Sequence, residues 1–289
     1  MRKYGALFLI ILHLFSCNYR YNVSSSRNTN VCKKLSGNLV LYAIFVDNDY
    51  TKPWTKFDIE STLDSVKNAI SWIEQMAEEN HISLKIKLDY PIVGDSVMRV
   101  ERKLPRRSVF ASVFSQNGPR NLKRWSDEIA KKVYEQTGAS DIAKGSKERL
   151  IAYIRNKEKS ESVGLMYFVN NYYKNDLSVC IRYPDDVEYC IVSYKYPVVI
   201  AHEFLHLFGA SDLYRQLYQK QRNKRLALKY FPNDIMLKTE DRSLESESIG
   251  ELEKYLIGWQ DTINPKYNNL LVEKYRKYTV RVISSHKSK

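Results

Sequence analysis

The stretch HEFLHLFGASDLY, from His202 to Tyr214, determines how the rest of the sequence is interpreted. On a helix, residues four apart lie on the same face, with Cβ atoms about 5–6 Å apart. His202 and His206 have this spacing, so both imidazoles can bind one metal ion while Glu203 projects beside them. Two histidine ligands with an adjacent general base are what metal-assisted hydrolysis of a peptide bond requires. The stretch therefore predicts a zinc site on a helix.

The residues after His206 predict where a third ligand lies. A helix that continued would carry later side chains away from the metal, whereas a glycine can adopt a positive φ and turn the chain back. Gly209 stands where such a helix end is useful, and Asp212 follows with a carboxylate, a normal zinc ligand at about 2.0–2.2 Å. A glutamate further along the chain could serve instead. The candidates are Glu240, Glu245, Glu247 and Glu251.

The string HEFLHLFGASD resembles the metzincin signature HExxHxxGxxH, with Asp212 as third ligand, as in the snapalysin-like branch of that clan. In detail the resemblance covers residues 202–236. It implies an α/β (α+β) fold: a mostly parallel twisted sheet with an antiparallel edge strand, an active-site helix and a smaller, mainly helical C-terminal lobe. It also implies a methionine turn beneath the metal, downstream of the third ligand, and Met236 is the only methionine after the motif. Tyr214 is a candidate for stabilising the oxyanion.

These residues predict a zinc-dependent endopeptidase that acts on protein or peptide substrates. Zinc would be held by His202, His206 and Asp212, and Glu203 would take a proton from the attacking water and deliver it to the leaving amine. Two alternatives stay open: a catalytically inactive zinc-binding surface lipoprotein that serves in binding or adhesion, and a gluzincin-type peptidase with a downstream glutamate ligand. The intact Glu203 favours an enzyme, because zinc binding alone does not need it.

The N-terminal sequence MRKYGALFLIILHLFSC predicts export from the cytoplasm. Two basic residues precede an apolar run that is too short to span a membrane, so residues 1–16 are predicted to be a signal peptide. The ending LFSC resembles a bacterial lipobox, which implies lipidation of Cys17; the alternative is an ordinary signal peptide with an incidental cysteine. We expect a lipid-anchored protein of the bacterial cell envelope, at the periplasmic face or the cell surface, with the outer membrane favoured. The polar residues 17–36 are predicted to form a tether.

The remaining length, residues 37–289, suits one two-lobed domain, with an upper lobe of about 37–209 and a lower lobe of about 210–289. The chain carries a formal charge of +13, but its basic residues are scattered and no nucleic-acid motif accompanies them. We therefore expect no nucleic-acid partner. The expected partners are the substrate and, through the N-terminal lipid, the membrane, and the chain is expected to be a monomer.

Hydrophobic periodicity predicts the secondary structure around the zinc helix. Strands, helices and a further strand alternate before it, which is typical of a mostly parallel sheet that carries helices. After it we predict a basic helical stretch, a C-terminal helix that Ser248 caps and one or two final strands. The predicted strands lie at 38–46, 82–88 and 163–171, the helices at 58–76 (capped by Asp58), 122–133, 148–156, 213–231 and 248–259, and the final strands within 269–285.

The segment LSVCIRYPDDVEYCIVSY predicts a β-hairpin with its turn at residues 184–186. Cys180 and Cys190 are equidistant from this turn, so they should be directly opposed and close enough for a disulfide, which an exported protein permits. The resemblance to metzincins implies that 177–183 is an edge strand on which an extended substrate lies. Cys32 would then be an inert or intermolecular thiol, or alternatively a latency thiolate that reaches the zinc.

Overall fold

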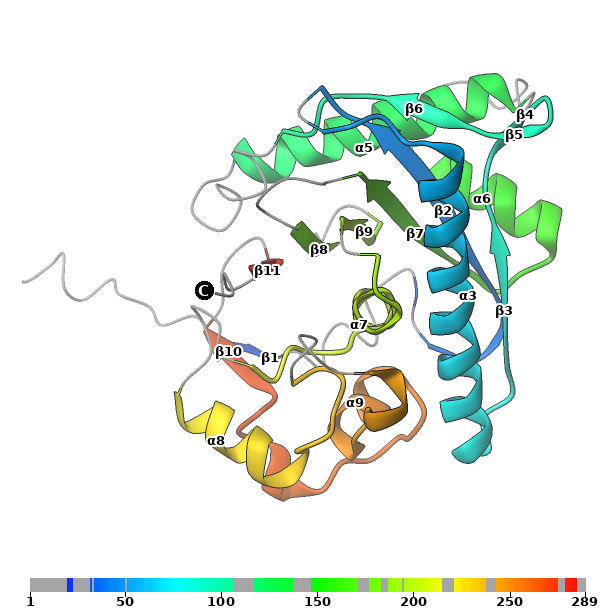
Figure 1. The fold of residues 1–289 in the computed structure, drawn as a ribbon. Coiled ribbons are helices and arrows are strands. Elements are labelled where there is room, and N and C mark those ends of the chain that lie inside the picture. Colours follow the sequence, from blue (N-terminus) through cyan, green and yellow to red (C-terminus); the bar gives the residue numbers. More distant parts are fainter. Residues whose placement is uncertain are drawn as a thin grey trace, which may run out of the picture.

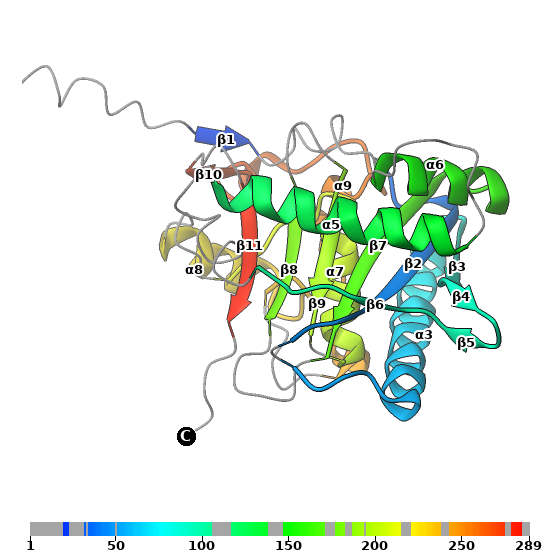
Figure 2. The same ribbon diagram turned by 90° about the horizontal axis from the view of Figure 1, so that it is seen from above.

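The computed structural model describes residues 20–22, 32, 34–49, 51–105, 117–137, 147–170, 177–182, 187–193, 195–214, 221–237, 243–274 and 279–284. A seven-stranded sheet forms its centre (Figures 1 and 2). In spatial order the strands are β11 (Thr279–Ser284), β8 (Leu177–Arg182), β9 (Tyr189–Val192), β7 (Ser162–Val169), β2 (Gly37–Asp47) and β3 (Leu84–Asp89), and β6 (Arg99–Glu101) pairs with the end of β2. The pairs from β3 to β9 are parallel, whereas β8 is antiparallel to both of its neighbours. The predicted mixed α/β class with a mostly parallel sheet is confirmed.

The central strand β2 is buried on both faces, which explains why its sequence is a continuous apolar run. Its side chains alternate between two hydrophobic clusters. Leu41 and Phe45 belong to the first cluster, whereas Tyr42 and Ile44 belong to the second. The sheet therefore separates two cores, and helices must cover each face.

Two pairs of helices cover the two faces of the sheet (Figures 1 and 2). The first cluster contains buried side chains of α3 (Lys56–Glu79) and α7 (Pro197–Leu207). The second contains those of α5 (Asn117–Gln136) and α6 (Lys147–Glu158). The metal helix predicted from the sequence is α7, so it lies in the first layer, beside α3.

The long helix α3 begins earlier than its apolar pattern predicts. Thr55, and not Asp58, is the N-cap: the Thr55 hydroxyl accepts a hydrogen bond from the Asp58 N–H at 3.1 Å. The Asp58 carboxylate in turn accepts from the Thr55 N–H at 3.3 Å. This is a capping box, in which a carboxylate at the third helical position satisfies the N–H of the cap. The predicted role of Asp58 as the cap itself was therefore wrong by one turn.

The C-terminal part of the chain packs on the side of α7 that faces away from the sheet (Figure 1). It contains α8 (Gln221–Tyr230) and α9 (Glu251–Leu256), whose buried apolar residues join the same cluster as α3 and α7. All residues of α7 from 198 to 207 are buried in consequence. The predicted cap at Ser248 was wrong, because Gly250 is the N-cap of α9. Smaller elements are η2 (Leu244–Ser246), η3 (Pro265–Tyr267) and the hairpin of β4 (Ile92–Val93) with β5 (Ser96–Val97).

Part of the stretch predicted as a tether belongs to the fold. β1 (Arg20–Asn22) pairs with β10 (Val272–Lys274). Leu35 is fully buried; its N–H donates to the carbonyl of Ile257 at 3.0 Å, and its own carbonyl accepts from the indole of Trp259 at 2.6 Å. The predicted signal peptide and the lipidated Cys17 lie outside the described residues. Among the described helices, none is both long enough and apolar enough to cross a membrane.

Candidate metal centre

Helix α7 places both histidines of the HEFLH stretch on one face. Pro197 occupies its first turn, where the missing N–H costs no hydrogen bond. The imidazole centroids of His202 and His206 are 4.6 Å apart, with the rings nearly perpendicular. Both side chains are buried, at 0% and 1% exposure. The one-turn spacing predicted from the sequence is confirmed.

The helix ends at Gly209, as predicted. Gly209 has φ of 107°, a left-handed conformation that side-chain-bearing residues rarely adopt. Its N–H donates to the carbonyl of His206 at 3.1 Å, and the N–H of Ala210 donates to that of Leu205 at 3.2 Å. These two bonds form a Schellman motif, which turns the chain back at the end of a helix. Asp212 is thereby returned to the histidines.

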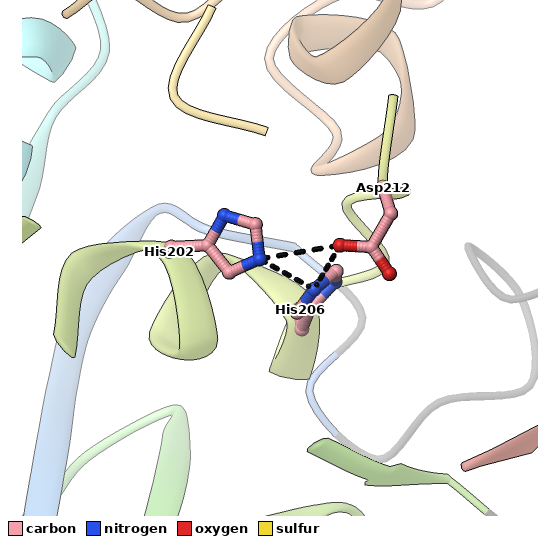
Figure 3. A group of neighbouring side chains, drawn as sticks. All are labelled: His202, His206 and Asp212. Atoms are coloured by element: carbon pink, nitrogen blue, oxygen red, sulfur yellow. Dashed lines mark hydrogen bonds and ion pairs between the residues drawn. The ribbon is translucent and has the colours of Figure 1, made fainter. Parts of the chain in front are cut away.

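Three ligand atoms converge at this point (Figure 3). His202 Nε2 and His206 Nε2 are 3.1 Å apart, and Asp212 Oδ1 lies 3.2 Å from the first and 2.9 Å from the second. A tetrahedral zinc ion with bonds of about 2.0–2.1 Å holds its ligand atoms about 3.3 Å apart. The three side chains could therefore hold one metal ion. Within the described part of the chain no other group of ligand atoms lies this close together, so Glu245, Glu247 and Glu251 do not take the place of Asp212 beside the two histidines. Glu240 lies outside the described residues.

The outer nitrogens of the two rings determine their tautomers. His202 Nδ1 lies 3.0 Å from the carbonyl oxygen of Ile235, and His206 Nδ1 lies 2.8 Å from that of Ala210. Because a carbonyl oxygen only accepts, each Nδ1 must carry the hydrogen, and in a neutral ring Nε2 then presents its lone pair. Two such lone pairs and the carboxylate of Asp212 face one another in a buried space. This arrangement is favourable with a cation between them, and backbone carbonyls behind both rings are usual at metal sites.

The segment that contains Met236 supports the site from the C-terminal side. Met236 is fully buried, and its carbonyl accepts from the N–H of Leu213 at 2.8 Å, next to Asp212. The carboxylate of Asp234 accepts from the N–H groups of Met236 and Gly250, each at 2.8 Å. Burial raises the pKa of Asp234 to about 6, although these two bonds lower it. The structure thus brings the predicted methionine segment to the site through its main chain.

The two remaining predicted residues also lie in this region. Glu203 follows His202 on α7 and is 1% exposed. Tyr214 is partly buried, and its ring centroid lies 6.3 Å from that of His202. Glu203 is therefore next to a candidate ligand in sequence, and Tyr214 is near a candidate ligand's ring in space; the catalytic roles of both stay predictions. Sequence reasoning missed the carbonyls of Ile235 and Ala210, because a backbone acceptor leaves no signal in the sequence.

The hairpin register is confirmed, but the predicted disulfide is not formed. Cys180 pairs directly with Cys190 in the ladder of β8 and β9. Both residues are separate thiols in the structure. The thiol of Cys190 donates to the carbonyl of Glu203 at 3.0 Å, so it is directed toward α7 and not across the ladder. Opposed positions made the bond geometrically possible, whereas this contact gives one thiol a different partner.

Strand β8 is not the open edge that the substrate prediction required. All six of its residues pair with β11 on one side, and four pair with β9 on the other (Figure 2). An extended peptide can add to a sheet only where backbone N–H and C=O groups are unpaired. The prediction was wrong because the hydrophobic pattern indicates strands but does not indicate which strand lies beside which.

Fold and site together define an α/β protein in which three buried side chains, two on α7 and one just after it, could hold a metal ion. Comparison with known proteins places the chain in no family: no protein-family model matches it, and no curated protein matches it. Its function must therefore be argued from its own residues.

Proposed function

We propose that the chain is a zinc-dependent endopeptidase. The observation that carries the proposal is the convergence of His202, His206 and Asp212 with their electron pairs directed at one buried point. Two neutral imidazoles and one carboxylate are a normal donor set for zinc, and they leave a divalent ion with one net positive charge. Zinc in such a site polarises a peptide carbonyl and lowers the pKa of a bound water.

The chain's own residues supply the proton transfers in this proposal. Glu203 would accept the proton of the attacking water and then deliver it to the leaving amine, which is general base followed by general acid catalysis. Tyr214, beside the ring of His202, is the candidate to donate a hydrogen bond to the oxyanion. The carbonyls of Ile235 and Ala210 keep the imidazoles in the tautomer and orientation that ligation needs.

The arrangement of elements supports a metzincin-like fold as part of the proposal. An antiparallel strand, β8, precedes the metal helix in sequence and packs against it, and the rest of the sheet is parallel. The glycine-ended helix, the returning Asp212 and the Met236 segment also follow the order that the resemblance implies. We further propose that the protein works as a monomer outside the cytoplasm, anchored in the bacterial envelope through a lipidated Cys17.

One observation favours a second candidate, a zinc-binding surface lipoprotein without peptidase activity. With β11 paired along β8, the edge that would hold an extended substrate is occupied. A protein that keeps zinc for structure would not need that edge. The two candidates differ in what Glu203 does, because only the peptidase requires its carboxylate.

The test uses Glu203→Gln in the full chain, with Glu251→Gln, an exposed glutamate on α9, as the matched control. We expect wild type and both variants to bind about one zinc per chain. Cleavage of denatured protein substrates should fall by at least about 10²–10⁴-fold in Glu203→Gln, because general base catalysis contributes on this scale. Metal content and cleavage-site profiling by mass spectrometry provide the measurement. Zinc-loaded wild type that cleaves nothing would favour the second candidate, and full turnover in Glu203→Gln would remove Glu203 from the mechanism.

A further inference from the structure

Glu253 is a fully buried carboxylate whose partner lies outside its own helix. It belongs to α9 and occupies the buried stripe of that helix, with Leu256 and Ile257 one turn further on. Its Oε2 accepts a hydrogen bond from the N–H of Ser211 at 2.8 Å, across 42 residues of sequence. Ser211 is the residue immediately before the proposed ligand Asp212. The buried carboxylate therefore binds the backbone next to the metal cluster.

The position of Glu253 in its helix shows that this contact is not an ordinary helix cap. Glu253 is the third residue of α9, and a glutamate there usually reaches back to the N–H of the N-cap residue. In this helix the N–H of the cap, Gly250, is bound by Asp234 Oδ2 at 2.8 Å. Because Asp234 takes over the capping role, Glu253 can extend to a different segment. Asp234 therefore caps α9, and Glu253 binds the N–H of Ser211 instead.

The consequence is that Asp212 lies between fixed points of the backbone. Before it, the carbonyl of Ala210 binds the ring of His206, and the N–H of Ser211 binds Glu253. After it, the N–H of Leu213 binds the carbonyl of Met236. Hydrogen bonds from a backbone N–H to a carboxylate are charge-assisted and stronger than neutral ones. The contact to Glu253 therefore anchors the segment that presents Asp212 through a second side chain, in addition to the ring of His206.

We propose that Glu253 is a positioning residue for Asp212, which sets the affinity and coordination geometry of the metal centre without touching the metal. This inference rests on the proposed metal centre but not on peptidase activity. Partners that orient metal ligands typically change metal affinity or activity by about 10–100-fold when they are removed. An effect of this size on zinc binding is therefore expected from losing the Glu253 carboxylate.

Three variants of the full chain test the proposal. Glu253→Ala removes the acceptor, Glu253→Asp keeps the charge but shortens the side chain, and Glu253→Gln keeps an acceptor oxygen at the same reach. Zinc affinity is measured by competition with a chelator of known affinity, and the absorption spectrum of the cobalt-loaded protein reports ligand geometry. We expect Ala and Asp to lower zinc affinity about 10–100-fold and to alter the cobalt spectrum, and Gln to restore most of both.

Glu188→Ala is the control for the general effect of truncating a buried acid. Glu188 is 4% exposed, like Glu253 a buried carboxylate. It directly precedes β9, and it is not one of the groups described above that bind the backbone around Asp212. It should lower stability without changing zinc affinity. Wild-type zinc affinity and cobalt spectrum in both Glu253→Ala and Glu253→Asp would overturn the proposal, as would a Gln variant as weak as Ala. None of these readouts requires turnover. If the wild type binds zinc but cleaves nothing, the proposed peptidase activity is refuted and the role of Glu253 can still be tested. If the wild type binds no zinc, both the peptidase proposal and the Glu253 proposal are overturned.

Discussion

At the scale of single residues, Cys32 shows how burial determines reactivity. It is 1% exposed, and its thiol donates to the carbonyl of Val163 at 3.4 Å. Burial raises the pKa of this thiol well above its ordinary value, and the charge of Glu188 raises it further. A latency cysteine must be a thiolate to bind zinc. The structure therefore favours the inert thiol among the roles considered for Cys32.

This gives a prediction about chemical modification. Iodoacetamide at pH 8 should leave Cys32 unmodified in the folded protein, because only the thiolate reacts and the thiol is both buried and protonated. In denaturant without a reducing agent, Cys32, Cys180 and Cys190 should all be alkylated, since all three are thiols in the structure. Peptide mass spectrometry provides the measurement. Rapid labelling of Cys32 in the folded chain, accompanied by a gain of activity, would restore the latency hypothesis.

Asp234 provides a prediction about pH. Its pKa is about 6 in the folded chain, against an ordinary value of 3.8. Between these values the folded chain holds a proton that the unfolded chain has released, so this residue makes the free energy of unfolding fall as pH rises from about 4 to about 6. The limiting slope is about 1.4 kcal/mol per pH unit. Urea unfolding of metal-free protein across this range, with Asp234→Asn as the reference, should show the difference. Identical slopes for both proteins would contradict it.

The grouping of side chains that are close in sequence could be predicted without a structure. His202, His206, Gly209 and Asp212 lie within eleven consecutive residues, so helix periodicity and the freedom of glycine are enough to predict that the two imidazoles and the carboxylate lie together. The role of Glu253 could not be predicted in this way. Its only signal is a carboxylate on the apolar stripe of a helix, and its partner is a backbone N–H far along the chain.

At the scale of elements, the end of α7 can be tested independently of its ligands. Gly209→Ala should destabilise the chain by about 1–3 kcal/mol, because a non-glycine residue is strained at φ of 107°. It should also weaken zinc binding, because the same turn returns Asp212 to the histidines. Gly94→Ala is the matched control. Gly94 also has a positive φ, of 59°, but a Cβ there would meet nothing within 4 Å.

Chemical denaturation and zinc competition on both glycine variants provide the measurement. Both should lose stability, and only Gly209→Ala should lose zinc affinity. Equal zinc affinity in the two variants would mean that the loop holds Asp212 without help from the helix end.

The pairing of β8 with β11 leads to a second prediction at this scale. A chain that ends at residue 278 should expose the outer edge of β8, and a fluorescent peptide of sequence TVRVIS, copied from β11, should bind there by strand addition. A chain that ends at residue 284 retains β11 and should not bind the peptide. Fluorescence anisotropy distinguishes these outcomes. Equal binding to both chains would show that β11 does not occupy this edge in solution.

Most elements could be predicted from periodicity, but their boundaries and partners could not. The apolar run at 38–46 lies in β2, and the apolar stripe at 58–76 lies in α3; each element is longer than predicted by a few residues. Caps set those boundaries, and Thr55 is a cap that the apolar pattern does not include. The pairing of β11 was missed because strand order depends on contacts between distant segments, which no local window contains.

At the scale of the whole molecule, the sheet separates two hydrophobic cores, which differ in the elements that they join. The core around α5 and α6 ends at the sheet, whereas the core around α3 and α7 also contains buried residues of the C-terminal helices α8 and α9. The sequence predicted an upper lobe of about 37–209, which includes the predicted zinc helix, and a lower lobe of about 210–289. Figure 1 shows α7 between the sheet and α9, although β11 returns from the C-terminal part to the sheet.

The contact of Leu35 with Ile257 and Trp259 constrains when this fold can form. Leu35 stands just before the central strand, and its hydrogen bond to Trp259 spans 224 residues of sequence. Ribosomes add about 5–20 residues per second, so the partner of Leu35 is made roughly 10–45 s after Leu35 itself. Throughout that interval the first strand and the histidines lack the segment that completes their core. The hydrophobic core that contains Leu35 and Ile257, and α7 with its two histidines, can therefore be completed only after nearly the whole domain has been synthesised.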